Sequence, residues 1–92
     1  MHYKAYNYLG NISFHEERVT KDFGAAIDFY KKAIEMKPDF DMPENSLGVI
    51  YKEYKKIDVA IDYFNNCLKK NPRNALAHFA LGNIEWENNH LK

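Results

Sequence analysis

The stretch FGAAIDFYKKAIEMKP at residues 23–38 returns as IDVAIDYFNNCLKKNP at residues 57–72, which sets a repeat period of 34. Apolar and small residues recur at matching places, Ala26 as Ala60 for example, and each stretch closes on a proline. A fixed period of this length is typical of a solenoid, in which each unit buries its apolar face against its neighbour. The sequence therefore predicts an all-α fold built as a stack of helical hairpins.

Apolar periodicity places the helices. In residues 23–36 the apolar positions lie three or four apart on one helical face, and the opposite face carries charged residues such as Lys31 and Glu35. Asp41 followed by Glu44 resembles a capping box for the third helix, and Asn74 is the expected N-cap of the fifth. The five expected helices cover about residues 2–17, 23–36, 43–55, 57–70 and 75–89.

The first helix resembles the fifth, because Leu9-Gly10-Asn11-Ile12 matches Leu81-Gly82-Asn83-Ile84. Their spacing of 72 equals two periods of 34 plus four. The four extra residues are expected near residues 17–20. They contain no glycine or proline and equal about one helical turn, which favours a longer first helix, with a longer loop as the alternative.

The whole chain, residues 1–92, is expected to form one domain. The first repeat covers about residues 3–40 with the insert near 17–20, the second covers 41–74, and a half repeat covers 75–92. Thirteen basic residues balance thirteen acidic ones, so no charge excess favours nucleic acid or an anionic membrane. Cys67 is the single cysteine; it predicts a small buried thiol and a reducing, cytoplasmic compartment.

Catalytic chemistry has no support in the sequence. The four histidines show no close helical pairing for a metal, and no nucleophile motif or phosphate-binding glycine loop is present. The chain is predicted not to be an enzyme and to need no metal or cofactor. No apolar run approaches the length of a membrane span.

The repeat resembles the tetratricopeptide repeat, a 34-residue helix–turn–helix. The second repeat carries almost the whole family pattern, as Leu47, Gly48, Tyr51, Ala60, Phe64, Cys67 and Pro72. The first repeat has Ser13 and the third has Glu85 where the family has an aromatic residue. Sel1-like repeats, which are longer and more variable, are the rival resemblance because of the insert. Either one implies a superhelix of antiparallel hairpins, right-handed in the tetratricopeptide case.

The resemblance implies a non-catalytic module that binds a peptide or helix of a partner protein in a concave groove, within a larger scaffold or assembly protein. The groove would be lined by the first helix of each hairpin. Carried onto this sequence, the partner-binding residues are Asn7, Asn11, Phe14, Asn45, Val49, Lys52, Phe79, Asn83 and Trp86. Family members that hold the carboxylate tail of chaperones use cations in this groove, but the matching positions here are Asn7, Asn11, Ser46, Leu76 and Ala80. Binding of a chaperone tail is therefore not expected.

The last expected helix is apolar on too many sides to end a stack, since terminal repeats normally present a polar outer face. We expect this helix to be covered by further sequence of a longer protein, by a second copy or by a partner. An exposed apolar face predicts self-association of the isolated chain. The alternative function is accordingly a structural self-association element that uses Leu81, Ile84, Trp86 and Leu91.

Overall fold

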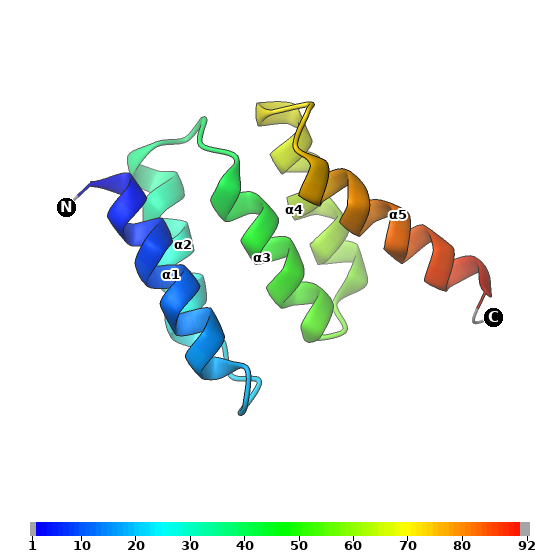
Figure 1. The fold of residues 1–92 in the computed structure, drawn as a ribbon, viewed down its shortest axis with the longest axis horizontal. Coiled ribbons are helices and arrows are strands. Elements are labelled where there is room, and N and C mark those ends of the chain that lie inside the picture. Colours follow the sequence, from blue (N-terminus) through cyan, green and yellow to red (C-terminus); the bar gives the residue numbers. More distant parts are fainter. Residues whose placement is uncertain (1, 91–92) are drawn as a thin grey trace.

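The chain folds into five α-helices in the computed structural model, which describes residues 2–90 except the side chain of His90 (Figure 1). Residues 2–90 contain no β-strand, so the predicted all-α class and the five helices are confirmed. Leu91, one of the predicted self-association residues, lies outside the described residues. The helices are α1 (Tyr3–Glu17), α2 (Gly24–Met36), α3 (Met42–Glu53), α4 (Ile57–Lys70) and α5 (Ala75–His90).

The helices pair as antiparallel hairpins that stack in chain order. The hairpin of α1 and α2 packs through α2 on α3, and the hairpin of α3 and α4 packs through α4 on α5. In Figure 1, α1, α3 and α5 lie on the nearer side of the stack, and α2 and α4 lie behind them. The fold is therefore the helical-hairpin solenoid that the repeat period predicts.

Two buried clusters hold the stack together. The first joins the two hairpins through Phe23, Ala26, Tyr30, Leu47 and Ile50. The second joins α4 to α5 through Ala60, Phe64, Cys67, Ala77 and Ile84. Most members sit at the repeating apolar positions of the sequence, so the period identifies much of the core.

A glycine in each first helix meets an aromatic ring of the paired second helix. A Cβ added to Gly10 would lie 2.6 Å from Cε1 of Tyr30, and one added to Gly48 would lie 2.6 Å from Cε1 of Phe64. These distances are shorter than any normal carbon–carbon contact, so only glycine lets the helices approach this closely. Gly82, the third member of the series, has nothing within 4 Å of an added Cβ in the described part of the chain.

The helix caps agree only in part with prediction. Asn74 caps α5 as expected, because its Oδ1 accepts a hydrogen bond from the backbone N–H of Ala77 at 2.9 Å. The prediction of a capping box at α3 is wrong, since the side chain of Asp41 makes no capping hydrogen bond to the first turn of that helix. Its Oδ2 instead accepts hydrogen bonds from the side-chain amides of Asn71 at 3.0 Å and Asn74 at 2.8 Å, which ties two inter-helix turns together.

The four-residue insert is divided between a helix and a loop. α1 ends at Glu17, two residues beyond the position that matches the end of α3, and the connection to α2 has six residues where the α3–α4 connection has three. The expected lengthening of the first helix therefore accounts for only part of the insert, and the alternative, a longer loop, accounts for the rest. The extra helical residues bring Glu17 to the start of α2, where its carboxylate accepts the N–H groups of Ala25 at 3.2 Å and Ala26 at 3.0 Å. Glu17 satisfies two amides that the first turn of α2 would otherwise leave without partners.

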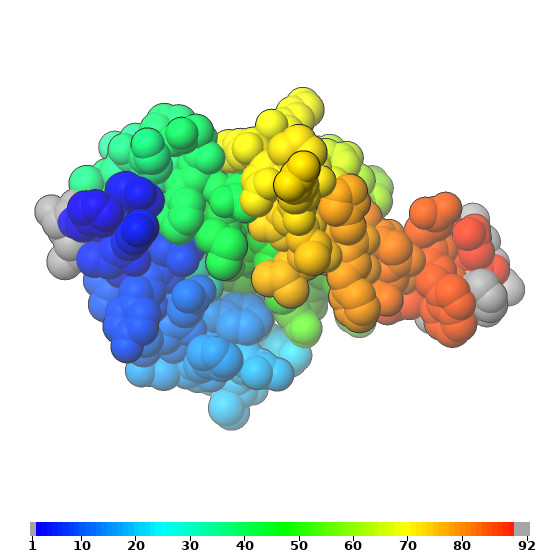
Figure 2. Space-filling model, turned by 45° about the horizontal axis from the view of Figure 1, so that its top comes forward, coloured from blue at the N-terminus to red at the C-terminus, as the bar shows by residue number. Residues whose placement is uncertain are grey.

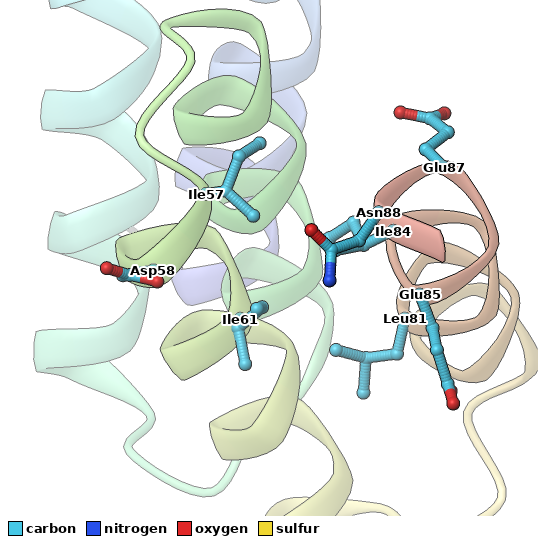
Figure 3. Close-up of a pocket in the computed structure, with 8 residues that line it drawn as sticks. All are labelled: Ile57, Asp58, Ile61, Leu81, Ile84, Glu85, Glu87 and Asn88. Carbon is cyan, nitrogen blue, oxygen red and sulfur yellow. The ribbon is translucent and has the colours of Figure 1, made fainter. Parts of the chain in front are cut away.

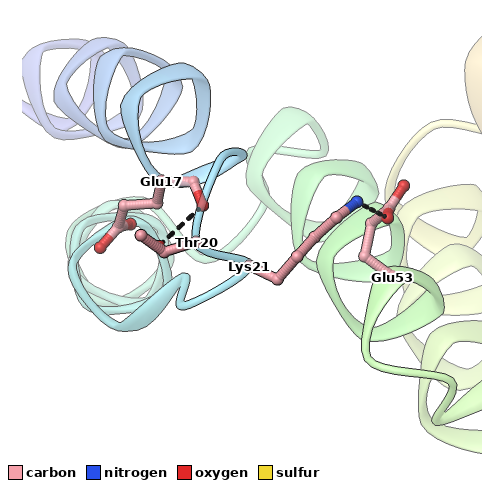
Figure 4. Close-up of polar contacts among 4 residues, drawn as sticks. All are labelled: Glu17, Thr20, Lys21 and Glu53. Atoms are coloured by element: carbon pink, nitrogen blue, oxygen red, sulfur yellow. Dashed lines mark hydrogen bonds and ion pairs between the residues drawn. The ribbon is translucent and has the colours of Figure 1, made fainter.

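The same loop also contacts the second hairpin. Lys21 forms an ion pair with Glu53 at 2.8 Å, and the hydroxyl of Thr20 donates to the backbone carbonyl of Glu17 (Figure 4). Lys21 and Lys55, which stand one repeat period apart, both have positive φ, at 62° and 64°. In both hairpins, the loop after the first helix therefore contains a lysine in the left-handed backbone conformation, which glycine adopts more easily than a residue with a Cβ.

Candidate functional site

Two adjoining hollows lie along the side of the stack formed by α1, α3 and α5. One lies between α1 and α3 and has a volume of about 170 Å³. The other lies between α3 and α5 and has a volume of about 270 Å³. Asn45 and Val49 line both hollows, so the two form one continuous surface across the three helices, which we call the concave groove.

The structure brings seven of the nine predicted partner-binding residues together in this groove. Asn45 and Val49 are shared by the two hollows, and the others line one hollow each. The seven are Asn11, Phe14, Asn45, Val49, Lys52, Phe79 and Asn83. Asn7 and Trp86 line neither hollow. Asn7 precedes Asn11 by one turn on α1, and Trp86, which is 57% exposed, follows Asn83 on α5.

The asparagine side chains in and beside the groove differ in their hydrogen bonding. Asn11 is already engaged, because its Oδ1 accepts the hydroxyl hydrogen of Tyr30 at 2.6 Å. Asn45 is only 9% exposed, and its Oδ1 is buried with no hydrogen-bond partner among the described residues. The Oδ1 of Asn7 is buried in the same way. Since a buried acceptor without a partner costs free energy, a bound donor at either position would recover it.

Apolar side chains lie next to the polar ones in the second hollow. Leu76 and Phe79 are 58% and 66% exposed, which is high for large apolar residues. They share the hollow with Val49 and with the amide of Asn45. This combination of an apolar anchor site and an unused acceptor suits a peptide segment better than a small charged metabolite.

Ion pairs balance the charges around the groove. Lys52 on α3 lies 3.6 Å from Glu87 on α5, and Lys21 in the α1–α2 loop lies 2.8 Å from Glu53. The hydrogen bond from Lys21 lowers the pKa of Glu53 below its usual value, partly opposed by burial of the carboxylate. Because Lys52 and Glu53, the charged residues that line the second hollow, are both paired, the hollow presents no strong charge to a ligand.

Two lining residues from second helices, Tyr30 and Phe64, escaped the sequence analysis of the groove. Tyr30 and Phe64 belong to second helices and reach the groove because Gly10 and Gly48 leave room for their rings. The spacing of small and aromatic residues in the sequence predicts that these rings lie in the core. It does not predict that the rings also line the groove. The buried, unpaired oxygen of Asn45 had no sequence signal, because nothing in the sequence says which donors lie nearby.

The residues predicted for self-association are not equally accessible. Ile84 is 7% exposed and belongs to the cluster between α4 and α5, and Leu81 packs against that cluster. Trp86 is more than half exposed. A substitution at Ile84 would therefore test the stability of the chain before it tested association.

The described residues offer little for catalysis. Between residues 2 and 90, no group of three or more His, Cys, Asp or Glu side chains could hold a metal ion. Cys67 is fully buried, and burial, reinforced by the negative charges of Asp41 and Glu44, raises the pKa of its thiol to about 11. The predicted small buried thiol is thus confirmed. None of the described helices has the length and apolar character needed to cross a membrane.

Comparison with known protein families matches residues 20–40 and 45–74 to the tetratricopeptide repeat. The two matched segments together cover more than half of the chain; the first contains α2, and the second contains most of α3 and all of α4. A search among curated proteins finds no match to the chain.

Proposed function

Because this chain belongs to the tetratricopeptide repeat family, we propose that it is a non-catalytic module that binds a peptide or helix of a partner protein in its concave groove. Repeats of this family generally mediate interactions between proteins. The proposal is specific to the surface shared by α1, α3 and α5. We place the module in a scaffold or assembly protein of the cytoplasm, a location that fits its single, fully buried thiol.

The observation that carries this proposal is the oxygen of Asn45. The residue lines both hollows of the groove, and its Oδ1 is buried without a donor among the described residues. If the Asn45 side chain turns this oxygen toward the groove, the backbone N–H groups of an extended peptide are free to donate to it, whereas those inside a helix are already bonded. The groove therefore favours an extended segment over a helical one.

The neighbouring apolar surface supplies an anchor for such a segment. Val49, Leu76 and Phe79 surround the second hollow beside Asn45. A large apolar side chain of the peptide would cover Phe79 while its backbone donates to Asn45. Binding energy in interfaces concentrates at such buried apolar anchors, so Phe79 is the expected hot spot.

Selection from a peptide display library on the immobilised 92-residue chain tests the proposal. The selected peptides are then measured against Asn45→Leu and Phe79→Ala by fluorescence anisotropy. We expect each substitution to weaken binding tenfold or more. Asn45→Leu should leave stability unchanged or higher because it removes an unpaired buried polar group.

Asn65→Leu is the matched control, since Asn65 is exposed on α4, outside both hollows of the groove. This variant should bind the selected peptides as the original chain does. A library that yields no peptide above background would contradict the proposal. So would peptides that bind equally well after both groove substitutions.

The alternative function, self-association through α5, draws on the exposed side chain of Trp86. Light scattering over a range of concentrations tests it on the unmodified chain. A mass that rises with concentration and returns to that of a monomer in Trp86→Ala would support this alternative. A monomer at every concentration would exclude it.

A further inference from the structure

The two hollows of the concave groove differ in chemistry. The first hollow, between α1 and α3, has a volume of about 170 Å³ and is lined by Asn11, Phe14, Tyr30, Asn45, Ser46 and Val49. None of these six residues carries a charge, and four of them have side chains that form hydrogen bonds. The first hollow is therefore polar and uncharged, whereas Leu76 and Phe79 give the second hollow an apolar surface.

A larger pocket, of about 650 Å³, lies outside the groove between α4 and α5, where its apolar lining is Ile57, Ile61, Leu81 and Ile84 (Figure 3). The C-terminal half of α5 projects from the rest of the molecule and leaves this pocket open (Figure 2). Among residues 2–90, no buried polar atom that lacks a partner belongs to its lining. The first hollow does contain such an atom, so it says more about the chemistry of a ligand.

Tyr30 fixes the orientation of one amide in the first hollow. Its ring lies on Gly10, and its hydroxyl donates to Oδ1 of Asn11 at 2.6 Å. Burial raises the pKa of Tyr30 above its usual value, partly opposed by a hydrogen bond with Ser46, so the hydroxyl keeps its hydrogen at neutral pH. Because Tyr30 holds the oxygen of Asn11, the opposite end of that amide, the N–H₂ group with its two donors, is left for a ligand.

Asn45 supplies the second amide of the first hollow. Its Oδ1 is buried without a donor among the described residues. A half-turn about χ2 exchanges the oxygen and the N–H₂ group, and a ligand amide pairs with either end because it carries a donor and an acceptor. A carboxylate only accepts and an ammonium only donates, so each of them pairs with one end alone. The oxygen of Asn45 has two lone pairs, so it can accept from a side chain and from a peptide backbone at once.

The uncharged lining also disfavours other classes of side chain. A charged group that entered the first hollow would lose its water and find no charge of opposite sign among the six lining residues. An apolar group would cover the amides of Asn11 and Asn45 and leave them without partners. Only an uncharged polar group avoids both costs.

The size of the first hollow suits a side-chain amide. A water molecule occupies about 30 Å³ in the liquid, so 170 Å³ corresponds to about five or six waters. A glutamine side chain has a similar number of non-hydrogen atoms. Its donor and acceptor lie on different atoms, which lets one group bridge Asn11 on α1 and Asn45 on α3.

We propose that the first hollow is a specificity subsite that selects an uncharged amide side chain, glutamine or asparagine, of the bound peptide. The carbonyl of this side chain accepts from the N–H₂ group of Asn11, and its own N–H₂ group pairs with the amide of Asn45. Tyr30 is a positioning residue, because it acts through Asn11. The subsite rests on the groove function proposed above and adds the residue that the peptide presents beside its apolar anchor.

The probe for the test is capped glutamine, N-acetylglutamine methylamide, added at neutral pH to the 92-residue chain labelled with ¹⁵N. Nuclear magnetic resonance follows the side-chain N–H₂ signals of Asn11 and Asn45. We expect saturable shifts and a dissociation constant at least about fivefold lower than for capped glutamate, lysine or methionine, which corresponds to one net hydrogen bond. All four ligands carry the same two backbone amides, so the difference belongs to the side chain.

Variants of the chain locate the subsite. Asn11→Leu removes the donor and should abolish the preference for glutamine. Asn11→Asp should shift the preference to capped lysine, because Tyr30 binds one carboxylate oxygen and the other is left for the ligand. Both changes are at an exposed residue, and thermal unfolding checks that the chain stays folded. Asn65→Leu, on α4 and outside both hollows, should leave the preference unchanged.

Three results would overturn the inference: no saturable shift with capped glutamine, equal dissociation constants for the four ligands, or a preference for glutamine that survives Asn11→Leu. Failure of the groove function gives a different result. A display library that yields no peptide, while capped glutamine still binds at Asn11 and Asn45, would contradict the groove function and support the amide site. Selected peptides that depend on Phe79 but share no glutamine or asparagine would contradict the subsite alone.

Discussion

Substitution of each helix glycine by alanine should have opposite effects in the hairpins and in α5. Gly48 and Gly82 stand at matching positions in the interiors of α3 and α5, so alanine gains about 1 kcal/mol of helix propensity at both. At Gly48 the new Cβ would lie 2.6 Å from the ring of Phe64, which is fully buried. Such overpacking costs about 1 to 3 kcal/mol. Gly48→Ala should therefore leave the free energy of unfolding unchanged or lower it by up to about 2 kcal/mol.

Gly82→Ala should raise the free energy of unfolding by about 1 kcal/mol, because its Cβ meets no neighbour among the described residues. The two variants should thus differ by about 1 to 3 kcal/mol, although the chemical change is identical. Urea unfolding followed by circular dichroism measures this difference, which corresponds to a gap in midpoint on the order of 1 M. Fluorescence of Trp86, the only tryptophan, reports α5 separately.

A double-mutant cycle tests whether the ring of Phe64 is the cause. Phe64→Leu removes the ring atoms that crowd the new Cβ, so the loss from Gly48→Ala should be smaller in that background. Gly10→Ala should lose at least as much as Gly48→Ala, since displacing Tyr30 also strains its hydrogen bond to Asn11. Equal changes in stability for Gly48→Ala and Gly82→Ala would refute the packing argument.

Three further predictions concern the two residues with positive φ, the hydrogen-bonded carboxylate of Asp41 and the thiol of Cys67. Lys55→Gly should raise the free energy of unfolding by about 1 kcal/mol in urea, because φ is 64° there, and Lys21→Gly should gain less because it also removes the ion pair with Glu53. Burial opposes ionisation of Asp41, but hydrogen bonds from two asparagine amides outweigh it and lower its pKa. Its contribution is therefore present above the unfolded pKa of about 3.9 and lost as pH falls through the folded pKa, so Asp41→Asn should cost stability at pH 7 and little at pH 2 in thermal unfolding. Cys67 should resist a thiol reagent at pH 8 and react only as fast as the chain unfolds, given its burial and a pKa of about 11.

The repeat period predicts the fold well because apolar burial depends on which helical face a residue occupies. Helix ends fall within two residues of prediction, and Ala26, Ala60, Phe64 and Cys67 are buried as their spacing requires. The family resemblance, not the period, supplied the nine expected groove residues, and seven of them line the two hollows. The helical face that a residue occupies, and whether it is buried, follow from the spacing of apolar residues and can therefore be predicted from the sequence.

Polar pairings escaped prediction because they depend on two partners and on their orientation. Asp41 looked like a helix cap, yet Asn71 and Asn74, far along the chain, offer its carboxylate two donors at once. Glu17 carried no sequence signal of a cap, yet its carboxylate caps α2 from across the loop. Both partnerships become visible only once the hairpins are stacked.

The same distinction explains why binding surfaces on a repeat protein are harder to predict than its core. Packing fixes the small and aromatic residues of every hairpin, and a departure from the pattern would destabilise the stack. Asn45 and Glu85 are free of that constraint, because one faces the groove and the other the open pocket. The side chain of Asn45 instead carries an acceptor without a donor, which the backbone of the proposed peptide would supply. A polar side chain without a partner inside the fold is therefore the place to look for specificity.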